Sequence, residues 1–473
     1  MRSERGPVLL SLMLATGLVA LDSTIIATAS SSIAKDLGHF QQLPWLFSVY
    51  LLAQAVSVPI YGRLADVLGR KRLLLVGIGL FLLGSVLCGA AWSMPVLIGA
   101  RVVQGLGAGA VLPISMTITS DIYTLEERAK TQGYLASVWG VASVVGPTLG
   151  GLFSEIGAWR WIFWINIPLA LIAAVMLLRS YQEHRNASER RERIDYLGAG
   201  LLAGGTTALL LGLLEGGTSW AWNAPASFGI FTAAVVLLVA FVIVERTVEQ
   251  PIFSLSLLTR RVVAASTIAS LVIGVIVMGL STYVPIYAQD VLGASALIAG
   301  FALAALTLGW PISAAQAGKI YLRRGFRFTA MIGASLVLVG ALLTITLAAQ
   351  SSIWLVALFC FVIGGGMGLT AVPALIAAQT SASWNERGAV TGTNMFARSM
   401  GSAIGVAVFG AVVNAHVRLD ASGVPEGAGL MTAMHLVFLS IAAVAVVLLV
   451  AVMFMPGHRR AERDVAAGDV ATA

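Results

Sequence analysis

The stretch Gly62-Arg63-Leu64-Ala65-Asp66-Val67-Leu68-Gly69-Arg70-Lys71-Arg72 joins two long apolar segments and has a partial copy later in the chain. A shift of the sequence on itself by 256 residues brings four pairs of glycines into register: Gly62 with Gly318, Gly69 with Gly325, Gly77 with Gly333, and Gly84 with Gly340. The same shift carries the second, fourth and fifth apolar segments onto the tenth, twelfth and thirteenth. The chain is therefore predicted to contain two related halves.

The apolar segments are long enough to cross a membrane. Hydrophobic residues make up 58% of the chain and charged residues 11%, whereas soluble domains carry about 25% charged residues. A helix needs about 20 apolar residues to span the hydrocarbon core. We predict fourteen spanning helices, with these approximate bounds: 7–29, 43–63, 73–91, 94–120, 134–156, 162–178, 196–214, 227–244, 263–288, 296–316, 329–349, 353–378, 389–412 and 431–455.

These spans predict an all-α polytopic membrane protein with two six-helix halves and an inserted helix pair. Parallel halves related about the membrane normal place the binding cavity between them, near the midplane. The predicted regions are an N-terminal half, a cytoplasmic linker with the inserted pair, a C-terminal half, and a cytoplasmic tail: 1–180, 181–250, 251–456 and 457–473.

The positive charges predict the orientation in the membrane. With the N-terminus inside, 24 of the 29 lysines and arginines fall in cytoplasmic segments, and only Lys35, Arg160 and Arg418 lie outside. This asymmetry predicts that both termini are cytoplasmic. It also accounts for the net charge of +7 without a nucleic-acid partner. Seven tryptophans lie at predicted outer helix ends, where their rings anchor at the headgroups: Trp45, Trp92, Trp159, Trp161, Trp220, Trp222 and Trp354.

The loop at residues 62–72 resembles a motif of the major facilitator superfamily, in which it acts as a latch on the cytoplasmic gate. Gly69 permits the tight turn, and Asp66 is placed to pair with cations or with an opposing helix N-terminus. The remaining motif residues are Gly62, Arg70 and Lys71. An ordinary basic loop would explain the arginines but not the glycines and the aspartate. The later copy has Leu322 at the aspartate position, so a second latch is not expected.

Three further stretches resemble the fourteen-span drug:H+ antiporters of that superfamily: residues 101–109 (RVVQGLGAG), residues 140–151 (GVASVVGPTLGG) and residues 159–168 (WRWIFWINIP). The resemblance extends over essentially the whole chain. It implies a bacterial cytoplasmic-membrane transporter, which we expect to act as a monomer without a cofactor.

Asp22 and Arg101 are charged residues inside predicted spans, where insertion of a charge costs about 2.5 to 3.5 kcal/mol. Helix geometry places them at similar depth in the same half, so they can pair directly or through Gln104. An aspartate in a half-dry cavity experiences two opposed effects, since desolvation favours the protonated form and a nearby arginine the ionised form. We expect these three residues to couple protons and substrate. A static ion pair between two helices is the alternative.

The fifth span contains Gly140, Gly146, Pro147, Gly150 and Gly151, which resemble the antiporter signature. Small residues let helices approach closely, and proline removes a backbone hydrogen bond. We expect this span to pack closely at the interface between the halves and to gate against leak, with ordinary membrane packing as the alternative.

Arg398 lies near the middle of the thirteenth span and is expected to contact an anionic or polar group together with Asn394, or else to serve in packing. Thioether and aromatic side chains adapt to different ligands. The candidate cavity residues of these types are Trp139, Met278, Tyr283, Tyr287 and Phe396. Core or lipid contact is the alternative for each of them.

These observations predict a proton-coupled antiporter that exports amphipathic organic compounds or drugs by alternating access. Export of a lipid or an endogenous metabolite is the alternative. An enzyme or sensor is disfavoured because the sequence contains no HExxH, GxSxG or P-loop motif and its five histidines are scattered. The binding partners we expect are small amphipathic substrates, protons and the lipid bilayer.

Overall fold

The protein is described by a computed structural model that covers residues 5–38, 42–183, 195–216, 220–248, 255–416 and 427–455. Its described part contains fourteen helices that are long and apolar enough to span a membrane, one at each predicted position. The prediction of an all-α polytopic protein is therefore confirmed.

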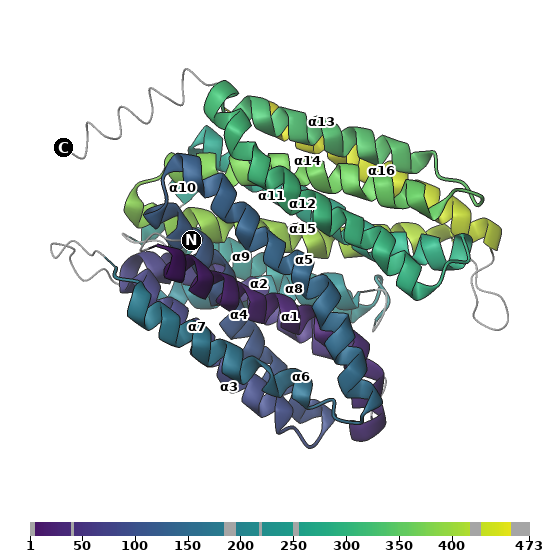
Figure 1. Ribbon diagram of the computed structural model, residues 1–473, viewed down its shortest axis with the longest axis horizontal. Coiled ribbons are helices and arrows are strands. Elements are labelled where there is room, and N and C mark those ends of the chain that lie inside the picture. The colour runs from purple at the N-terminus through teal and green to yellow at the C-terminus, as the bar shows by residue number, and fades with distance from the viewer. Residues whose placement is uncertain are drawn as a thin grey trace.

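The helices form two halves and an inserted pair (Figure 1). The N-terminal half contains α1 (Gly6–Leu37), α2 (Leu43–Leu68), α3 (Arg70–Gly89), α4 (Met94–Ile122), α5 (Leu125–Glu155), α6 (Trp161–Trp164) and α7 (Asn166–Ser180). The inserted pair is α8 (Tyr196–Glu215) and α9 (Pro225–Thr247). The C-terminal half contains α10 (Leu255–Thr259), α11 (Arg261–Ile286), η2 (Tyr287–Val291), α12 (Ala296–Arg324), α13 (Phe326–Ile345), α14 (Ile353–Thr380), η3 (Trp384–Glu386), α15 (Arg387–His416) and α16 (Gly427–Met453).

Some helices begin or end outside the apolar stretches that predicted them. Helix α5 begins at Leu125 and not near residue 134, because Thr124 and Glu127 form a capping box ahead of the apolar segment. Helix α12 continues to Arg324, well beyond residue 316. Hydropathy marks the membrane-embedded part of a helix, whereas capping residues decide where the helix begins.

The repeated glycines have the same structural roles in both halves. Gly69 and Gly325 join consecutive helices with positive φ angles of 97° and 87°, which favour glycine. Gly84 of α3 and Gly340 of α13 allow close helix contacts, since a Cβ atom would lie 2.5 Å from Gln104 N and from Ile363 Cγ1 respectively. The internal repeat thus marks equivalent turns and helix crossings.

Two interfaces, here called seams, join the halves. The first seam is the contact of α2 with α15, and the second is the contact of α5 with α12. The repeat relates the two seams, because it matches α2 with α12 and α5 with α15. Helix α8 of the inserted pair packs against both helices of the first seam. Figure 1 shows α5 and α12 on the near face of the molecule, with α8 and α9 behind.

Candidate functional site

A charged pair lies at the centre of the N-terminal half. Arg101 Nη1 on α4 is 2.5 Å from Asp22 Oδ2 on α1, and both side chains are only 1% exposed. Gln104, one turn after Arg101, donates from Nε2 to Asp22 Oδ1 at 2.8 Å and accepts from Arg101 Nη1 at 2.7 Å. The structure thus brings together Asp22 and Arg101, which the sequence placed at similar depth, and Gln104 contacts both of them.

Neutral groups from the neighbouring helices complete this buried cluster. Ser85 of α3 accepts from Gln104 Nε2 at 2.9 Å, and Asn166 of α7 lies within 3.5 Å of Asp22 Oδ1. On the other side, Arg101 donates to the Leu46 carbonyl of α2 at 3.2 Å. Its guanidinium lies 4.0 Å from the Tyr50 ring centroid, a cation–π contact. Arg101 of α4 is therefore held by contacts with α1 and α2 of the same half.

Asp22 does not lie in a half-dry cavity between the halves, where the sequence suggested that it would be. Helices α1, α3, α4 and α7 enclose the carboxylate within the N-terminal half, and every member of the cluster is nearly or fully buried. A buried charge is tolerated because each oxygen receives a donor. In this conformation the pair is shielded from water.

The C-terminal half has polar groups but no buried acid–base pair among its described residues. The side chain of Asn394 on α15 accepts from Ser270 of α11 at 2.9 Å and donates to Ser266 at 3.3 Å. Arg398, one turn later, lies 5.3 Å from the ring centroid of Trp310 on α12. In this conformation the side chain of Asn394 contacts α11 and that of Arg398 contacts α12.

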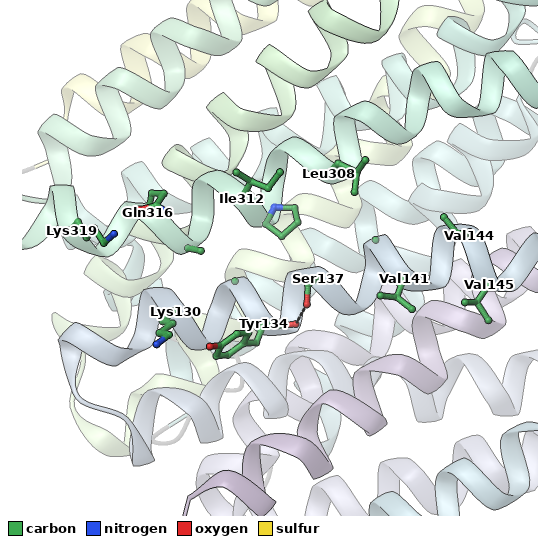
Figure 2. A pocket seen from close by; sticks show the side chains of 14 residues that line it. Lys130, Tyr134, Ser137, Val141, Val144, Val145, Leu308, Ile312, Gln316 and Lys319 are labelled. Carbon is green, nitrogen blue, oxygen red and sulfur yellow. Dashed lines mark hydrogen bonds between the residues drawn. The ribbon is translucent and has the colours of Figure 1, made fainter. Parts of the chain in front are cut away.

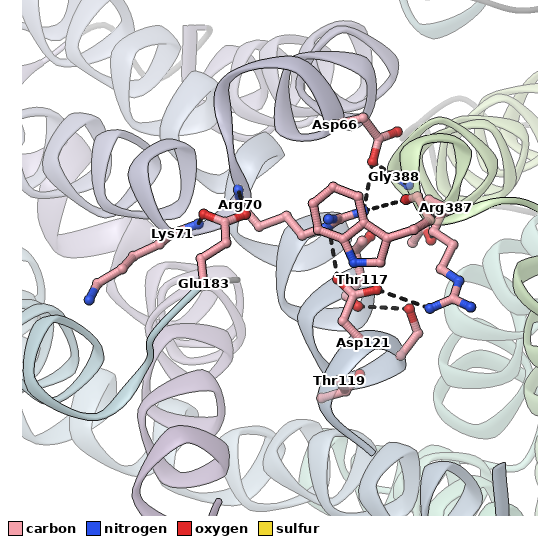
Figure 3. A network of polar contacts seen from close by, with 12 residues as sticks. Asp66, Arg70, Lys71, Thr117, Thr119, Asp121, Glu183, Arg387 and Gly388 are labelled. Atoms are coloured by element: carbon pink, nitrogen blue, oxygen red, sulfur yellow. Dashed lines mark hydrogen bonds and ion pairs between the residues drawn. The ribbon is translucent and has the colours of Figure 1, made fainter. Parts of the chain in front are cut away.

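Asp66 connects the halves at the end of the bundle that the charge pattern predicts to be cytoplasmic. Its carboxylate accepts from the backbone N–H groups of Gly388 and Ala389 at 3.0 and 2.9 Å, at the first turn of α15 (Figure 3). Helix N-termini carry a partial positive charge and unpaired N–H groups, which a carboxylate satisfies. Gly62 permits this approach, since a Cβ atom there would lie 2.7 Å from the Gly388 carbonyl oxygen.

Arg70 extends the connection to two further elements. Its Nη2 lies 3.0 Å from Asp66, and its Nε lies 2.9 Å from Asp121 at the end of α4. The guanidinium also donates to the Trp384 carbonyl of the opposite half at 2.6 Å and stacks on that indole ring at 3.6 Å. Asp121 in turn pairs with Arg387 of α15 at 3.3 Å. We call Asp66, Arg70, Asp121, Trp384 and Arg387 the latch cluster.

The side chain of Lys71 makes its hydrogen bonds within the N-terminal half. Its ammonium donates to the Leu178 carbonyl at 2.9 Å and to the Tyr181 carbonyl, while Glu183 accepts from the backbone N–H groups of Arg70 and Lys71 at 2.6 and 3.2 Å. Glu183 thereby caps the N-terminus of α3 in the same way that Asp66 caps α15.

Helix α5 packs against α12 of the other half, as predicted, but not through all the glycines of its motif. Gly146 faces α1, where a Cβ atom would collide with the Thr24 hydroxyl, and that hydroxyl donates to the Ala142 carbonyl at 2.9 Å. Gly140 and Gly151 have open space where a Cβ atom would lie. The prediction of close packing is therefore wrong at Gly140 and Gly151, whereas the span itself lies at the interface between the halves. Gly150 is buried, and Pro147 lies within the helix.

Two of the candidate cavity residues belong to the core of the C-terminal half. Tyr283 packs edge-to-face on Phe409, and Tyr287 donates to the Ala348 carbonyl at 2.7 Å. Phe396 lies between the first seam and α8, Met278 is half-buried on α11, and Trp139 is exposed on α5. A single apolar pocket formed by all five side chains is not observed. Apolar residues on membrane helices look alike in sequence whether they face the core, lipid or a cavity.

Sequence reasoning missed the uncharged partners of the buried pair, three members of the latch cluster and the carboxylate that caps α3: Ser85, Asn166, Asp121, Trp384, Arg387 and Glu183. Asn166 stands in a stretch that the sequence singled out, residues 159–168. The others carried no local signal, because each acquires its role only by contact with a distant segment.

Comparison with known proteins agrees with this geometry. The profile of the Major Facilitator Superfamily matches residues 12–406. Multidrug resistance protein 3 of Bacillus subtilis (strain 168) is 36% identical over 406 residues, which cover 86% of this chain and 79% of the relative. Multidrug transporter protein MdtP of the same organism is 34% identical over 414 residues, with coverages of 88% and 76%.

A solved structure shares the fold at low sequence identity. The human organic anion transporter MFSD10 (TETRAN) is 15% identical and superposes with a TM-score of 0.66 over 96% of this chain and 100% of that one. The expected family is thus confirmed by sequence and by fold: this chain is a membrane transporter, not an enzyme, and it belongs to the Major Facilitator Superfamily.

Proposed function

We propose that the protein is a proton-coupled antiporter that exports amphipathic organic compounds or drugs across the bacterial cytoplasmic membrane. In this proposal it works as a monomer, with both termini in the cytoplasm, and the proton gradient drives export without a cofactor. The names of its two Bacillus subtilis relatives support a multidrug cargo.

The observation that carries the proposal is the buried contact between Asp22 and Arg101. Protonation of Asp22 removes the negative charge that Arg101 and Gln104 hold in place, and Arg101 is left without its counter-ion. Breaking a buried pair by removing one partner costs about 3 to 5 kcal/mol. That energy is large enough to shift an equilibrium between two conformations by more than a hundredfold, so a single proton can drive the conformational change.

Transport by alternating access also needs a gate that opens and closes, and the latch cluster provides one. It joins α2 and α4 of one half to α15 of the other at the predicted cytoplasmic end. Alternating access in this superfamily is rocking of one half against the other around a fixed site. We propose that the structure represents a state closed at that end, and that proton binding at Asp22 favours release of the latch.

Arg398 and Trp310 are proposed to contact the cargo from the C-terminal half. The guanidinium of Arg398 is half-buried in a spanning helix and has no carboxylate partner in the described part of the chain. An intramembrane cation without a protein counter-ion is a candidate ligand contact. Replacement of Arg398 by Met is expected to change the relative export of cationic and anionic compounds, as measured with matched dyes.

Transport in inverted vesicles tests the proposal. An imposed pH gradient should drive accumulation of a fluorescent cationic drug, and Asp22→Asn should abolish it. Asp36→Asn is the matched control, since Asp36 lies on the same helix but is exposed at its far end. Gradient-driven uptake that persists in Asp22→Asn would refute the proton role.

A double variant separates proton coupling from a static ion pair. If the pair only holds α1 against α4, then Asp22→Asn combined with Arg101→Gln should restore gradient-driven transport, because neither charge is then left unpaired. If Asp22 carries the proton, the double variant should fold but remain uncoupled. A susceptibility panel in a pump-depleted host separates drug export from export of a lipid or metabolite, which would protect against no drug.

A further inference from the structure

A groove runs along the second seam, between α5 and α12, and has a volume of about 890 Å³ (Figure 2). The two helices touch near the predicted cytoplasmic end, where a Cβ atom on Gly133 would lie 3.1 Å from Ala315 Cβ. Farther along α5, Gly140 lines the groove and has open space beside it. The helices therefore separate enough to leave room for a ligand.

The chemistry of the groove changes along its length. Lys130 of α5 and Lys319 of α12 lie at one end, as Figure 2 shows. Tyr134, Ser137 and Gln316 come next, and the remainder is aliphatic: Val141, Val144, Val145, Leu308, Pro311 and Ile312. Two cations, a short polar zone and a long apolar zone match the order of groups in a phospholipid of one leaflet.

The length of the groove also matches one leaflet. From Lys130 to Val145 a helix rises about 22 Å, and from Lys319 to Leu308 about 16 Å, at about 1.5 Å per residue. One leaflet of hydrocarbon is about 15 Å thick. A headgroup held at the lysines would therefore place its acyl chains along the aliphatic wall.

The two lysines are available to an anionic ligand. Neither ammonium pairs with a carboxylate within the described ranges, and both side chains are exposed. Glu126 lies one turn before Lys130 on α5 but forms no ion pair with it, and Glu127 is engaged by Arg5 at 3.3 Å. Positive charges close to an anionic leaflet surface each contribute about 1 kcal/mol of attraction.

The groove opens sideways, away from the inserted helix pair. Val141, Ile312 and Leu308 are 63%, 56% and 51% exposed although they belong to spanning helices, so they leave an uncovered apolar surface along the groove. The related first seam is covered by α8, which packs against both α2 and α15. Within the described ranges, the inserted pair thus covers the first seam and leaves the second uncovered.

We propose that this groove binds one anionic phospholipid, with its phosphate between Lys130 and Lys319 and an acyl chain along Val141, Leu308 and Ile312. The bound lipid fills the second seam in the conformation closed at the latch. Rocking of the halves changes the separation of α5 and α12, so the lipid stabilises one conformation over the other.

Lipid retention by the purified full chain in nanodiscs tests the site. Discs of phosphatidylcholine with an equal fraction of phosphatidylglycerol should yield protein that retains phosphatidylglycerol selectively, measured by native mass spectrometry. The double variant Lys130→Ala/Lys319→Ala should lose about 25-fold in this preference, or about fivefold per lysine. The double variant Lys130→Arg/Lys319→Arg should keep it.

A matched control removes the same charge from the same end of the molecule. Arg323 and Arg324 end α12 but do not line the groove. The variant Arg323→Ala/Arg324→Ala should retain phosphatidylglycerol as the parent protein does. If it lost as much of the preference as Lys130→Ala/Lys319→Ala, only net charge would matter, and the proposal would be overturned.

The apolar half of the site is tested without a change of charge. Val141→Trp fills the exposed aliphatic wall and should reduce lipid retention while both lysines remain. Inorganic phosphate in excess should not displace the lipid, and displacement would show a simple anion site. Equal retention of phosphatidylcholine and phosphatidylglycerol would overturn the proposal. The measurement involves no transport, so its outcome is independent of the proton-coupling experiments.

Discussion

The two seams are related by the internal repeat, yet they are built from different chemistry. At the first seam, Asp66 caps α15 across the halves, and α8 packs against α2 and α15. At the second seam, Leu322 occupies the position equivalent to Asp66 and is 39% exposed. There the cross-half polar contact is the Tyr321 hydroxyl, which donates to the Leu125 carbonyl.

This difference shows how a duplicated scaffold can acquire two functions. The repeat preserves glycines because turns and helix crossings need them in both halves. The carboxylate that caps a helix of the other half is instead found at the first seam, and the equivalent position of the second seam is Leu322. A carboxylate on a helix N-terminus makes a strong and reversible contact. We therefore expect the first seam to act as the switch and the second to yield as the halves rock.

The largest effect is expected from Asp66→Asn, which weakens the cap on α15 and leaves Arg70 with only Asp121 as a buried acidic partner. Loss of a buried charged contact costs several kcal/mol, so transport should fall about tenfold or more. The matched control is Leu322→Asn at the equivalent position of the second seam, which should transport normally. Initial rates in vesicles, normalised to protein amount, measure both, and equal losses would contradict the assignment of the switch to the first seam.

The second-largest effect on transport is expected from a glycine that lets the backbones of α2 and α15 approach closely. Gly62→Ala places a methyl group 2.7 Å from the Gly388 carbonyl oxygen, so α2 and α15 must move apart and the latch must weaken. Transport should fall about fivefold. Gly140→Ala meets open space at the second seam and should leave transport unchanged, with a gain in thermal stability of up to about 1 kcal/mol from helix propensity. Cysteine cross-linking of α2 to α15 would show whether the first seam has widened.

These two seams also show what the sequence could predict and what it could not. The fourteen spans, the repeat, and the similar depth of Asp22 and Arg101 followed from hydropathy, register and helical rise, which depend on local sequence. Similar depth permits the direct contact of these two side chains but does not establish it. The partners Asp121, Trp384 and Arg387 are far from Asp66 in sequence, and only the packed helices bring them together. The groove likewise depends on where α5 and α12 separate, and hydropathy does not encode the distance between helices.

A smaller effect is expected from Tyr321→Phe, which removes the hydrogen bond from the Tyr321 hydroxyl across the second seam. A hydrogen bond contributes about 1 kcal/mol net, so transport should change by no more than about fivefold. Tyr287→Phe is the control, because its hydroxyl donates to the Ala348 carbonyl within the C-terminal half and not across the halves. A loss as large as that of Asp66→Asn would make the second seam an equal part of the switch.

The smallest effect is expected at Asp36, which lies outside both seams and beyond the membrane-spanning part of α1. Hydrogen bonds from Arg160 at 2.6 Å and Trp159 at 3.0 Å lower the pKa of Asp36 below its usual 3.8. A lowered folded-state pKa adds stability above the unfolded value, and this stability is lost only as the pH falls below it. The carboxylate is about half exposed, so the pair contributes at most about 1 kcal/mol.

Asp36→Asn should therefore lower thermal stability slightly and by the same amount at pH 6 and pH 8, with an unchanged pH profile of transport. Asp22→Asn should instead abolish gradient-driven transport at both pH values, because its proton is the one proposed to be carried. The two variants remove one carboxylate each from the same helix, so the net charge is matched and only the burial of the carboxylate differs. If the transport defect of Asp36→Asn depended on pH, a carboxylate outside the buried cluster would also affect proton coupling. That result would contradict the assignment of the proton to Asp22.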